Sequence, residues 1–467
     1  MRCTLDGHTL QTAIPNPVKD ICRMLRDNGK ECYIVGGATR DLLMGEEPKD
    51  WDLTTNARPD EMPEIFKPLH VIPTGEKHGT MTVMKDGEGY EVTTYRVDGP
   101  YTDKIRPDYI EFADSLQEDL QRRDLSINAI AYEPLDDRIV TTPNDGIHDL
   151  KARIIRAPGD PAARFAEHPI RLIRACRFQS RLGFDLDPAT ERALEENAEL
   201  IRTQPDEAIG LELEKLLLQS ERPSIGIECL RRAGILKIIW PELDATYGVE
   251  QPGQFHKYDV YKHTMEAMDA TPKDNVDVRW ALAWHDTGKP IVREWVEEKD
   301  RYMFIGHEDV SAELAKSGMR RLGFSNKKAD KVASLAKHHM IHYSDEWTDK
   351  AVRKFVGKVG EENLEDLFLV KAGDIIGSGT DTDAGMAKCD RLRARIDSLR
   401  TESGKAEFGE KDLAVNGHDI MEHMGLEPGP QIREIKAYLL DKVLGDPGLN
   451  TKRDLYRLMD QIECGGA

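Results

Sequence analysis

The sequence has no long apolar run and no apolar leader. Its mean hydropathy is −0.56, and 32% of its residues are charged against 39% that are hydrophobic. A transmembrane helix needs about 20 consecutive apolar residues, and a secretory leader needs a basic start followed by an apolar stretch. The first residues, MRCTLDGHTLQ, have neither feature. The sequence therefore predicts a cytoplasmic protein with no membrane partner.

Cysteine is scarce and scattered. The seven cysteines are odd in number, and no two of them form a C-x-x-C pair. Disulfide frameworks and structural zinc sites normally show even numbers or closely spaced pairs. We therefore expect reduced thiols.

Basic residues are fewer than acidic ones, 65 against 85, which gives a formal net charge of −20. Binding to a polyanion normally needs a basic surface, so the total argues against a nucleic-acid partner. One basic island, residues 151–183, carries eight basic and two acidic side chains. Two interpretations stay open with equal weight: a footprint for phosphates, or an arginine-rich helix face paired with acids elsewhere.

Length and periodicity divide the chain. At about 150 residues per domain, 467 residues predict roughly three domains. Strand-like runs and short helices alternate before residue 150, with a hairpin turn at Asp86-Gly87, whereas helical periodicity with Pro and Gly breaks dominates after residue 160. The expected strands are 32–35, 53–55, 79–84, 90–95 and 127–132. We expect an α+β part followed by helical parts, with boundaries near 245–259 and 401–412.

A double glycine follows the apolar run YIV in the segment GGATRDLLMGEEPKDWDL, residues 36–53. This order predicts a strand, a glycine turn at Gly36 and Gly37, and a short helix from about Ala38 that stops at Gly45. Glycines beside a helix start expose amides that can receive a phosphate. A plain turn is the alternative.

Two aspartates end that segment. If DWDLTTN continues as a strand, Asp50 and Asp52 share one face while Trp51 and Leu53 point to the other. Neighbouring carboxylates repel each other unless a cation or a proton lies between them, and Mg²⁺ prefers such oxygen ligands. The alternative is a solvated strand edge.

A second polar cluster lies in EDLQRRDLSINAIAY, residues 118–132. Arg122 and Arg123 suit a triphosphate because guanidinium groups donate in forks, and Asp124 and Asn128 suit ribose hydroxyls. The last two are four residues apart, so they share a face if the segment is helical. A salt-bridged helix start is the alternative.

These motifs resemble those of class II tRNA nucleotidyltransferases and bacterial poly(A) polymerases, which belong to the DNA polymerase β superfamily. Residues 36–52 resemble the first motif of that family, and RRDLSINA resembles the second. The segments 144–157, 164–178 and 211–236 resemble the remaining motifs in the expected order. Five ordered matches over residues 31–240 are far more specific than any one of them.

The resemblance implies template-free addition of nucleotides from CTP and ATP to the 3′ end of tRNA. Asp50 and Asp52 would be the catalytic carboxylates that hold Mg²⁺, with Glu91 as a third acid. The fold would be a polymerase β-like head, a mixed sheet with helices, followed by an all-α neck and body. The nucleotide would be bound by Gly36, Gly37, Arg40, Arg123, Asp124, Asn128, Glu167, His168, Arg171, Arg174 and Arg177.

The base-reading motif departs from the family pattern. CCA-adding enzymes carry E-D-x-x-R in the neck, and the matching residues here are Glu167, His168 and Arg171. A carboxylate accepts hydrogen bonds from the exocyclic amine of cytosine or adenine, whereas a neutral imidazole offers one acceptor and one donor. Base selection is then expected to be relaxed or pH-dependent. The alternative is that His168 only caps a helix before Pro169.

The second half holds His263, the adjacent His285-Asp286 and Asp374 in an order that resembles the HD phosphohydrolase domain. Imidazole and carboxylate ligands bind divalent metals that activate water. His307, His338, His339 and His342 are further candidates for a second metal. The resemblance implies hydrolysis of 2′,3′-cyclic or terminal phosphates on RNA ends.

The resemblance places the domains at 1–150 (head), 151–244 (neck and body), 245–400 (an all-α HD domain) and 401–467 (a helical C-terminal region). Two other functions stay open: a poly(A) polymerase, and an HD phosphohydrolase with a vestigial head. The acidic second half counts against general RNA binding, and the complete Asp50/Asp52 and Arg123/Asp124 motifs count against a vestigial head.

Overall fold

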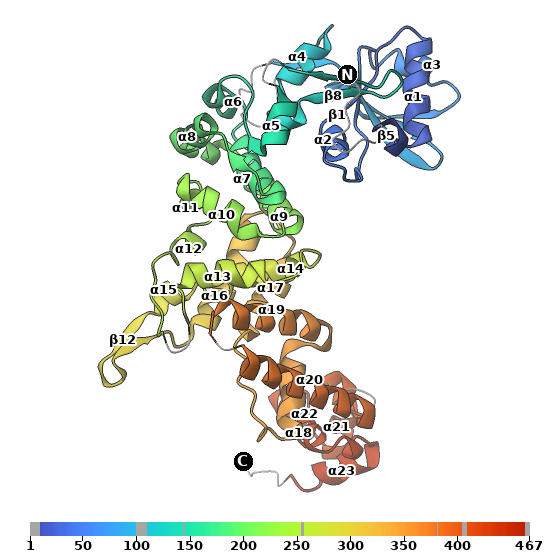
Figure 1. The fold of residues 1–467 in the computed structure, drawn as a ribbon. Helices are drawn as coiled ribbons and strands as arrows, with labels where there is room; N and C mark the ends of the chain where they lie inside the picture. Colours follow the sequence, from blue (N-terminus) through green and yellow to red (C-terminus); the bar gives the residue numbers. More distant parts are fainter. Residues whose placement is uncertain are drawn as a thin grey trace. The chain divides into compact units, whose positions relative to one another are not determined.

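The computed structural model describes residues 10–99, 110–142, 145–253, 256–380, 382–403 and 409–462. The chain forms two compact units, Met1–Pro241 and Glu242–Ala467, and each is treated by itself (Figure 1). Cys3, Cys464 and Asn144 lie outside the described residues. The five described cysteines are free thiols, as expected.

The first unit begins with a seven-stranded sheet in the order β3-β4-β5-β2-β1-β8-β9. Only β2 and β5 run parallel, and every other neighbouring pair is antiparallel. The strands are β1 (Tyr33–Val35), β2 (Leu53–Thr55), β3 (His70–Gly75), β4 (Thr80–Lys85), β5 (Glu88–Thr94), β8 (Ile130–Glu133) and β9 (Arg138–Thr141). The turn between β4 and β5 has positive φ at Asp86 and Gly87, which matches the predicted hairpin.

Both faces of this sheet are covered. Alternate residues of β1 enter two different cores, Ile34 on one face and Tyr33 and Val35 on the other, as the period of two requires. Helices α1 (Asn16–Asp27), α2 (Gly37–Leu43) and α3 (Met62–Ile65) cover the first face, and α4 (Leu116–Gln121) covers the second.

Short helices and small ribbons complete the first unit (Figure 1). The 3₁₀ turns are η1 (Leu10–Ala13), η2 (Glu76–His78), η3 (Ser126–Asn128) and η4 (Ala198–Thr203). The ribbons are β6 (Arg96–Asp98) with β7 (Ile110–Phe112) and β10 (Ile154–Ile155) with β11 (Asp185–Leu186). The helices are α5 (Gly146–Ala152), α6 (Pro161–Glu167), α7 (Arg171–Leu182), α8 (Pro188–Glu196), α9 (Asp206–Gln219), α10 (Pro223–Arg232) and α11 (Leu236–Ile239).

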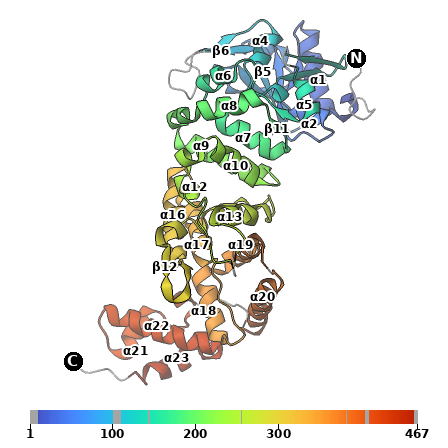
Figure 2. The same ribbon diagram turned by 60° about the vertical axis from the view of Figure 1, so that its left-hand side comes forward.

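The second unit is helical apart from the ribbon β12 (Glu294–Val296) with β13 (Arg301–Met303). Short helical turns complete it: α12 (Pro241–Asp244), which starts at the unit boundary, α15 (Lys289–Val292), η5 (Glu297–Lys299), η6 (Glu361–Asn363), η7 (Glu410–Asp412) and η8 (Pro447–Leu449). The longer helices are α13 (Val260–Asp269), α14 (Val276–Trp284), α16 (His307–Arg321), α17 (Asn326–His338), α18 (Asp349–Val359), α19 (Leu364–Gly377), α20 (Asp383–Ser403), α21 (Gly417–Met424), α22 (Pro430–Gly445) and α23 (Lys452–Met459). The last three lie together (Figure 2), and with the residues just before α21 they share one apolar cluster.

Three local expectations are wrong. The strand predicted over DWDLTTN begins at Leu53, although the Val35 amide still donates to the Asp52 carbonyl at 3.0 Å. The expected strand 127–132 begins at Ile130, because residues 126–128 form η3. No α-helix joins Asp124 to Asn128, since α4 ends at Gln121. The fold class is confirmed, with two ribbons added to the helical parts.

Candidate active sites of the two units

The glycine turn after β1 brings three predicted residues together. Gly36 has φ 71, a left-handed conformation that side chains disfavour. A Cβ on Gly36 would lie 3.4 Å from Arg123 Nη1 and 3.7 Å from Asp52 Oδ2. The position of the missing side chain therefore lies between a guanidinium and a carboxylate.

Asp52 lies among other acids. Strands β2 and β5 pair with Leu53 opposite Val92, which places Glu91 beside Asp52 at the preceding position. Burial raises the pKa of Asp52, the charges of Glu91 and Asp50 add to that rise, and Arg123 opposes it. Asp50 itself is exposed. A carboxylate with a raised pKa among like charges is stabilised in its ionised form by a bound cation.

Asp119 is a residue that the motif search missed. It is fully buried on α4 and pairs with Arg122 Nη2 at 2.8 Å and with Arg123 Nη2 at 3.0 Å. Burial alone would raise the pKa of Asp119, but the two arginines outweigh it and hold the pKa below its usual value. Asp119 precedes Arg122 by three residues and Arg123 by four, and these spacings in the sequence could have predicted the two ion pairs.

Asp124 and Asn128 meet without a shared α-helix. Asn128 Nδ2 donates to Asp124 Oδ1 at 3.1 Å, and Arg40 Nη1 donates to Asn128 Oδ1 at 2.6 Å. Arg174 of α7 donates to Asp124 Oδ2 from Nε at 2.8 Å and from Nη2 at 2.5 Å. Burial would raise the pKa of Asp124, but Arg174 and Asn128 hold it far below its usual range. Four of the predicted nucleotide-binding residues therefore form one hydrogen-bonded chain.

The predicted base-reading residues flank the joint between α6 and α7. Glu167 accepts from Arg164 Nη1 at 2.9 Å and from Arg171 Nη1 at 3.1 Å, and Arg171 Nη2 donates to the Arg122 carbonyl at 2.7 Å. His168 is the C-terminal cap of α6, with φ −140, as the capping alternative expects. Its role in reading a base stays a prediction.

Described arginines of the basic island have acidic partners elsewhere. Arg156 pairs with Asp149 and Asp187, and buried Arg177 donates to Glu212 at 2.8 Å and to Gln219 at 2.8 Å. Arg174 and Arg181 pair with Asp124 and Asp41. The second interpretation of the island therefore fits these arginines. The Arg177 guanidinium is thus occupied by side chains of α9 in the body.

In the second unit, four predicted ligands converge from α13, the end of α14 and α19. His263 Nε2 lies 3.0 Å from His285 Nε2, 3.4 Å from Asp286 Oδ2 and 3.2 Å from Asp374 Oδ1. His285 Nε2 lies 3.3 Å from Asp286 Oδ2. The Nδ1 atom of His285 faces the Leu282 carbonyl at 2.6 Å, so that nitrogen carries the proton and Nε2 keeps its lone pair.

A second group of ligands shares Asp286. His307 Nε2 lies 3.3 Å and His339 Nε2 lies 3.8 Å from Asp286 Oδ1, while Oδ2 faces the first group. The two Nε2 atoms of this group are 3.3 Å apart, and both Nδ1 atoms face carbonyls, those of Phe304 and Ala336. Two lone pairs at this distance require a proton or a cation between them. Within the described residues, these are the two clusters of three or more ligand side chains; His338 and His342 join neither.

Two lysines and burial shift the pKa values of the ligand side chains in the second unit. Lys289 Nζ lies 2.6 Å from Asp286 and Lys371 Nζ lies 2.7 Å from Asp374. Burial would raise the pKa of both aspartates, but the neighbouring histidines and lysines hold each pKa well below its usual value. Burial lowers the pKa of His285 to about 4, so its imidazole is neutral near pH 7 and able to bind a metal.

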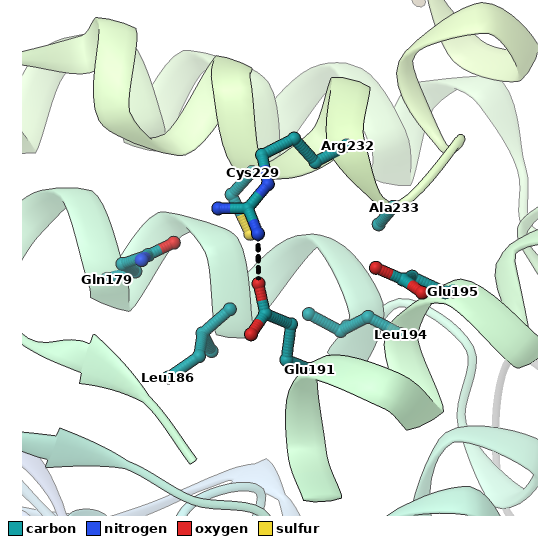
Figure 3. Close-up of a pocket in the computed structure, with 8 residues that line it drawn as sticks. All are labelled: Gln179, Leu186, Glu191, Leu194, Glu195, Cys229, Arg232 and Ala233. Atoms are coloured by element: carbon teal, nitrogen blue, oxygen red, sulfur yellow. Dashed lines mark hydrogen bonds and ion pairs between the residues drawn. The ribbon is translucent and has the colours of Figure 1, made fainter. Parts of the chain in front are cut away.

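A hollow between α7, α8 and α10 is not the site. It is lined by Gln179, Leu186, Glu191, Leu194, Glu195, Cys229, Arg232 and Ala233 (Figure 3). Arg232 and Glu191 pair across it at 2.7 Å. None of the predicted site residues lines it, and besides that ion pair Glu195 is the one further charged side chain of its lining.

Three segments match known domain families. Residues 32–156 match the family described as "Poly A polymerase head domain", and residues 183–247 match "Probable RNA and SrmB-binding site of polymerase A". Residues 255–376 match "HD domain". None of the helices within the described ranges is both long and apolar enough to cross a membrane.

Relatives that match over nearly the whole of this chain show the family to which it belongs. A CCA-adding enzyme of Pediococcus pentosaceus is 44% identical over 444 residues, which cover 95% of this chain and 97% of the relative. The chain belongs to the family of CCA-adding enzymes. A family member from Geobacillus stearothermophilus is 31% identical over 441 residues, 93% and 94% of the two chains. The crystal structure of the Bacillus stearothermophilus CCA-adding enzyme in complex with CTP matches with a TM-score of 0.70 at 28% identity, over 96% of this chain and 98% of that one. The enzyme class and the HD domain expected from the sequence are therefore confirmed.

Because Asp286 belongs to both groups of ligands, we expect the second unit to bind two metal ions. With Mn²⁺ as the probe, and Asp50→Asn/Asp52→Asn as background to remove binding by the head, we expect two ions per chain by elemental analysis. His339→Ala should leave one ion, and Asp286→Asn should weaken both sites because it removes the shared ligand. His342→Ala is the matched control and should keep two. Two ions retained in His339→Ala would contradict the second group.

Proposed function

We propose that this chain adds C and A nucleotides from CTP and ATP to the 3′ end of tRNA. The observation that carries the proposal is the juxtaposition at Gly36, where a Cβ would contact both Arg123 and Asp52. A guanidinium suits the phosphates of a nucleotide and a carboxylate suits a metal ion. The two groups on either side of one open position match the needs of phosphoryl transfer.

In the head, Asp50 and Asp52 would hold Mg²⁺, with Glu91 as the third acid. Bound there, the metal neutralises the charge that develops when the RNA 3′-hydroxyl attacks the α-phosphate and pyrophosphate leaves. Arg123 would contact the triphosphate, since its Nε has no hydrogen-bond partner among the described residues. Asp124 and Asn128 would orient the ribose, with the amides of Gly36 and Gly37 near the phosphates.

Arg40 takes a different part in this proposal. Its side chain is 1% exposed, with Nε and Nη2 on Asp41 and Nη1 on Asn128. All three guanidinium nitrogens of Arg40 already donate to Asp41 or Asn128, so Arg40 would orient Asn128 instead of contacting the nucleotide. Arg177, enclosed by Glu212 and Gln219, would in the same way hold α7 on the body.

For base selection, His168 and Arg171 would face the base edge and Glu167 would orient Arg171, with Arg174 near the phosphates. Arg171 is tied to the Arg122 carbonyl and to Glu167, which fixes its direction. An imidazole in place of the family's carboxylate changes the acceptor that the exocyclic amine meets. We therefore expect weaker discrimination between CTP and ATP.

The second unit would hydrolyse phosphate esters at RNA ends, including 2′,3′-cyclic phosphates. His263, His285 and Asp374 would hold one divalent ion, His307 and His339 a second, and Asp286 would bridge them. Such a pair, when bound, supplies a nucleophilic hydroxide near neutral pH. The boundaries 1–150, 151–244, 245–400 and 401–467 and the cytoplasmic location stay predictions.

Removing the head carboxylates tests the transfer activity. Asp50→Asn and Asp52→Asn should each lower labelled CMP incorporation into tRNA lacking its CCA end by about a hundredfold or more, the usual cost of losing one group that stabilises transition-state charge. Asp60→Asn changes an exposed aspartate of the same unit and should leave the rate unchanged. Incorporation that survives in the double variant would refute the mechanism.

Restoring the family's carboxylate tests base selection. His168→Asp should sharpen the ratio of kcat/KM for CTP and ATP by about tenfold, because one good base contact is worth roughly 1–3 kcal/mol of discrimination. The ratio is measured on tRNA lacking CCA and on tRNA ending in CC. His148→Asp, at a side chain that is 70% exposed, is the control. An unchanged ratio in His168→Asp would leave His168 as a helix cap alone.

A further inference from the structure

Helix α7 is fastened to the head through three arginines. Arg171 reaches the Arg122 carbonyl, Arg174 reaches the Asp124 carboxylate, and Arg181 in the last turn reaches Asp41 Oδ2 at 3.3 Å. From these contacts we infer that Asp41 and Arg181 are positioning residues, which fix the angle of α7 on the head and thereby the distance from the base-reading segment to the catalytic carboxylates. The inference rests on the proposed nucleotide transfer and concerns the selection step of that reaction.

The contacts close into a ring that starts and ends on α7. Arg181 pairs with Asp41 Oδ2, and Asp41 Oδ1 accepts from Arg40 Nε at 2.8 Å and from Nη2 at 2.6 Å. Arg40 continues to Asn128, and the chain then reaches Asp124 and Arg174. Arg174 and Arg181 are seven residues, two helical turns, apart, so they lie on the same face of α7.

The ring has an inner and an outer part. Asp124, Asn128 and Arg174 are the members proposed to meet the nucleotide. Asp41 and Arg181 are on the far side of Arg40, and their side chains are 9% and 24% exposed. A partly buried pair is screened less than a surface pair, which suits a contact that positions α7 without itself meeting the nucleotide.

Because a helix is rigid, a change at the Arg181–Asp41 contact displaces the other end of α7. Ten residues separate Arg171 from Arg181, about 15 Å along a helix. If Arg181 is released, α7 can pivot about the Arg174–Asp124 contact, and the displacement appears at the base-reading end. The effect is expected on nucleotide selection and KM more than on kcat, because Asp50, Asp52 and Arg123 belong to the head and not to α7.

The principal variant is Arg181→Gln, since Asp41 also partners Arg40. On tRNA lacking CCA, we expect the ratio of kcat/KM for CTP and ATP to change by about threefold to thirtyfold, with a rise in nucleotide KM and less than a threefold change in kcat, the range that coupled contacts usually show. Arg181→Lys keeps the charge and should recover part of the selectivity. Because both changes break one contact, adding Arg181→Gln to Asp41→Asn should change little further.

The control is Arg202→Gln, which removes an arginine from an exposed i,i+3 pair with Glu199 in the same unit and should alter neither constant. Two outcomes would overturn the inference: a lower melting temperature in Arg181→Gln with kcat, KM and the ratio unchanged, or additive effects in the double variant.

A readout independent of activity separates this inference from the proposed function. Amide hydrogen exchange over residues 171–182 should be faster in Arg181→Gln than in the parent chain, while exchange in β1, β2 and β5 is unchanged. Unchanged protection of α7 would overturn the inference even if nucleotide transfer is confirmed. Faster exchange in a chain that transfers no nucleotide would support the fastening of α7 and refute the proposed activity.

Discussion

The contact between Asp124 and Arg174 is the interaction on which the first unit depends. It joins a carboxylate from the segment between α4 and η3, 11% exposed, to a guanidinium from the helical neck, 36% exposed, with two hydrogen bonds of 2.8 and 2.5 Å. Removing Arg174 would leave the largely buried Asp124 carboxylate uncompensated, which costs more than a fully exposed pair is worth. The head and α7 are therefore held in one arrangement, and the residues proposed to read the base keep their place relative to Asp50 and Asp52.

The same principle explains how an acidic chain carries a basic segment. Four arginines between residues 151 and 183, namely Arg156, Arg174, Arg177 and Arg181, pair with carboxylates of the head and body: Asp41, Asp124, Asp149, Asp187 and Glu212. Their positive charge is therefore balanced within the first unit. In the second unit, single histidines and aspartates from several segments meet around Asp286, and two lysines offset the charge of the carboxylates. Each unit thus has its own charged centre.

Local patterns predicted the elements of the head well, and contacts distant in sequence poorly. The strands β1, β2, β4 and β5 and the turn at Asp86 follow from short patterns with a physical cause. His263, His285, Asp286 and Asp374 were expected from a family resemblance, and the structure brings them together. The extent of the strand before Leu53 and the 3₁₀ turn at Asn128 depend on tertiary packing, which overrides local periodicity. The pairing of Asp41 with Arg181 spans 140 residues, and no pattern in one sequence selects it. Distinguishing His307 and His339, which lie beside Asp286, from His338 and His342 also required the fold, since residue type alone makes all four candidates.

The central claim is that this chain builds a defined C-C-A end on tRNA without a template. The most direct measurement is to sequence the 3′ ends of tRNA that lacks its CCA end after incubation of the unaltered chain with CTP, ATP and Mg²⁺. The account predicts products extended by C, C and A, with some misplaced C or A because histidine replaces the family's carboxylate. Long runs of A, or unextended ends, would contradict it.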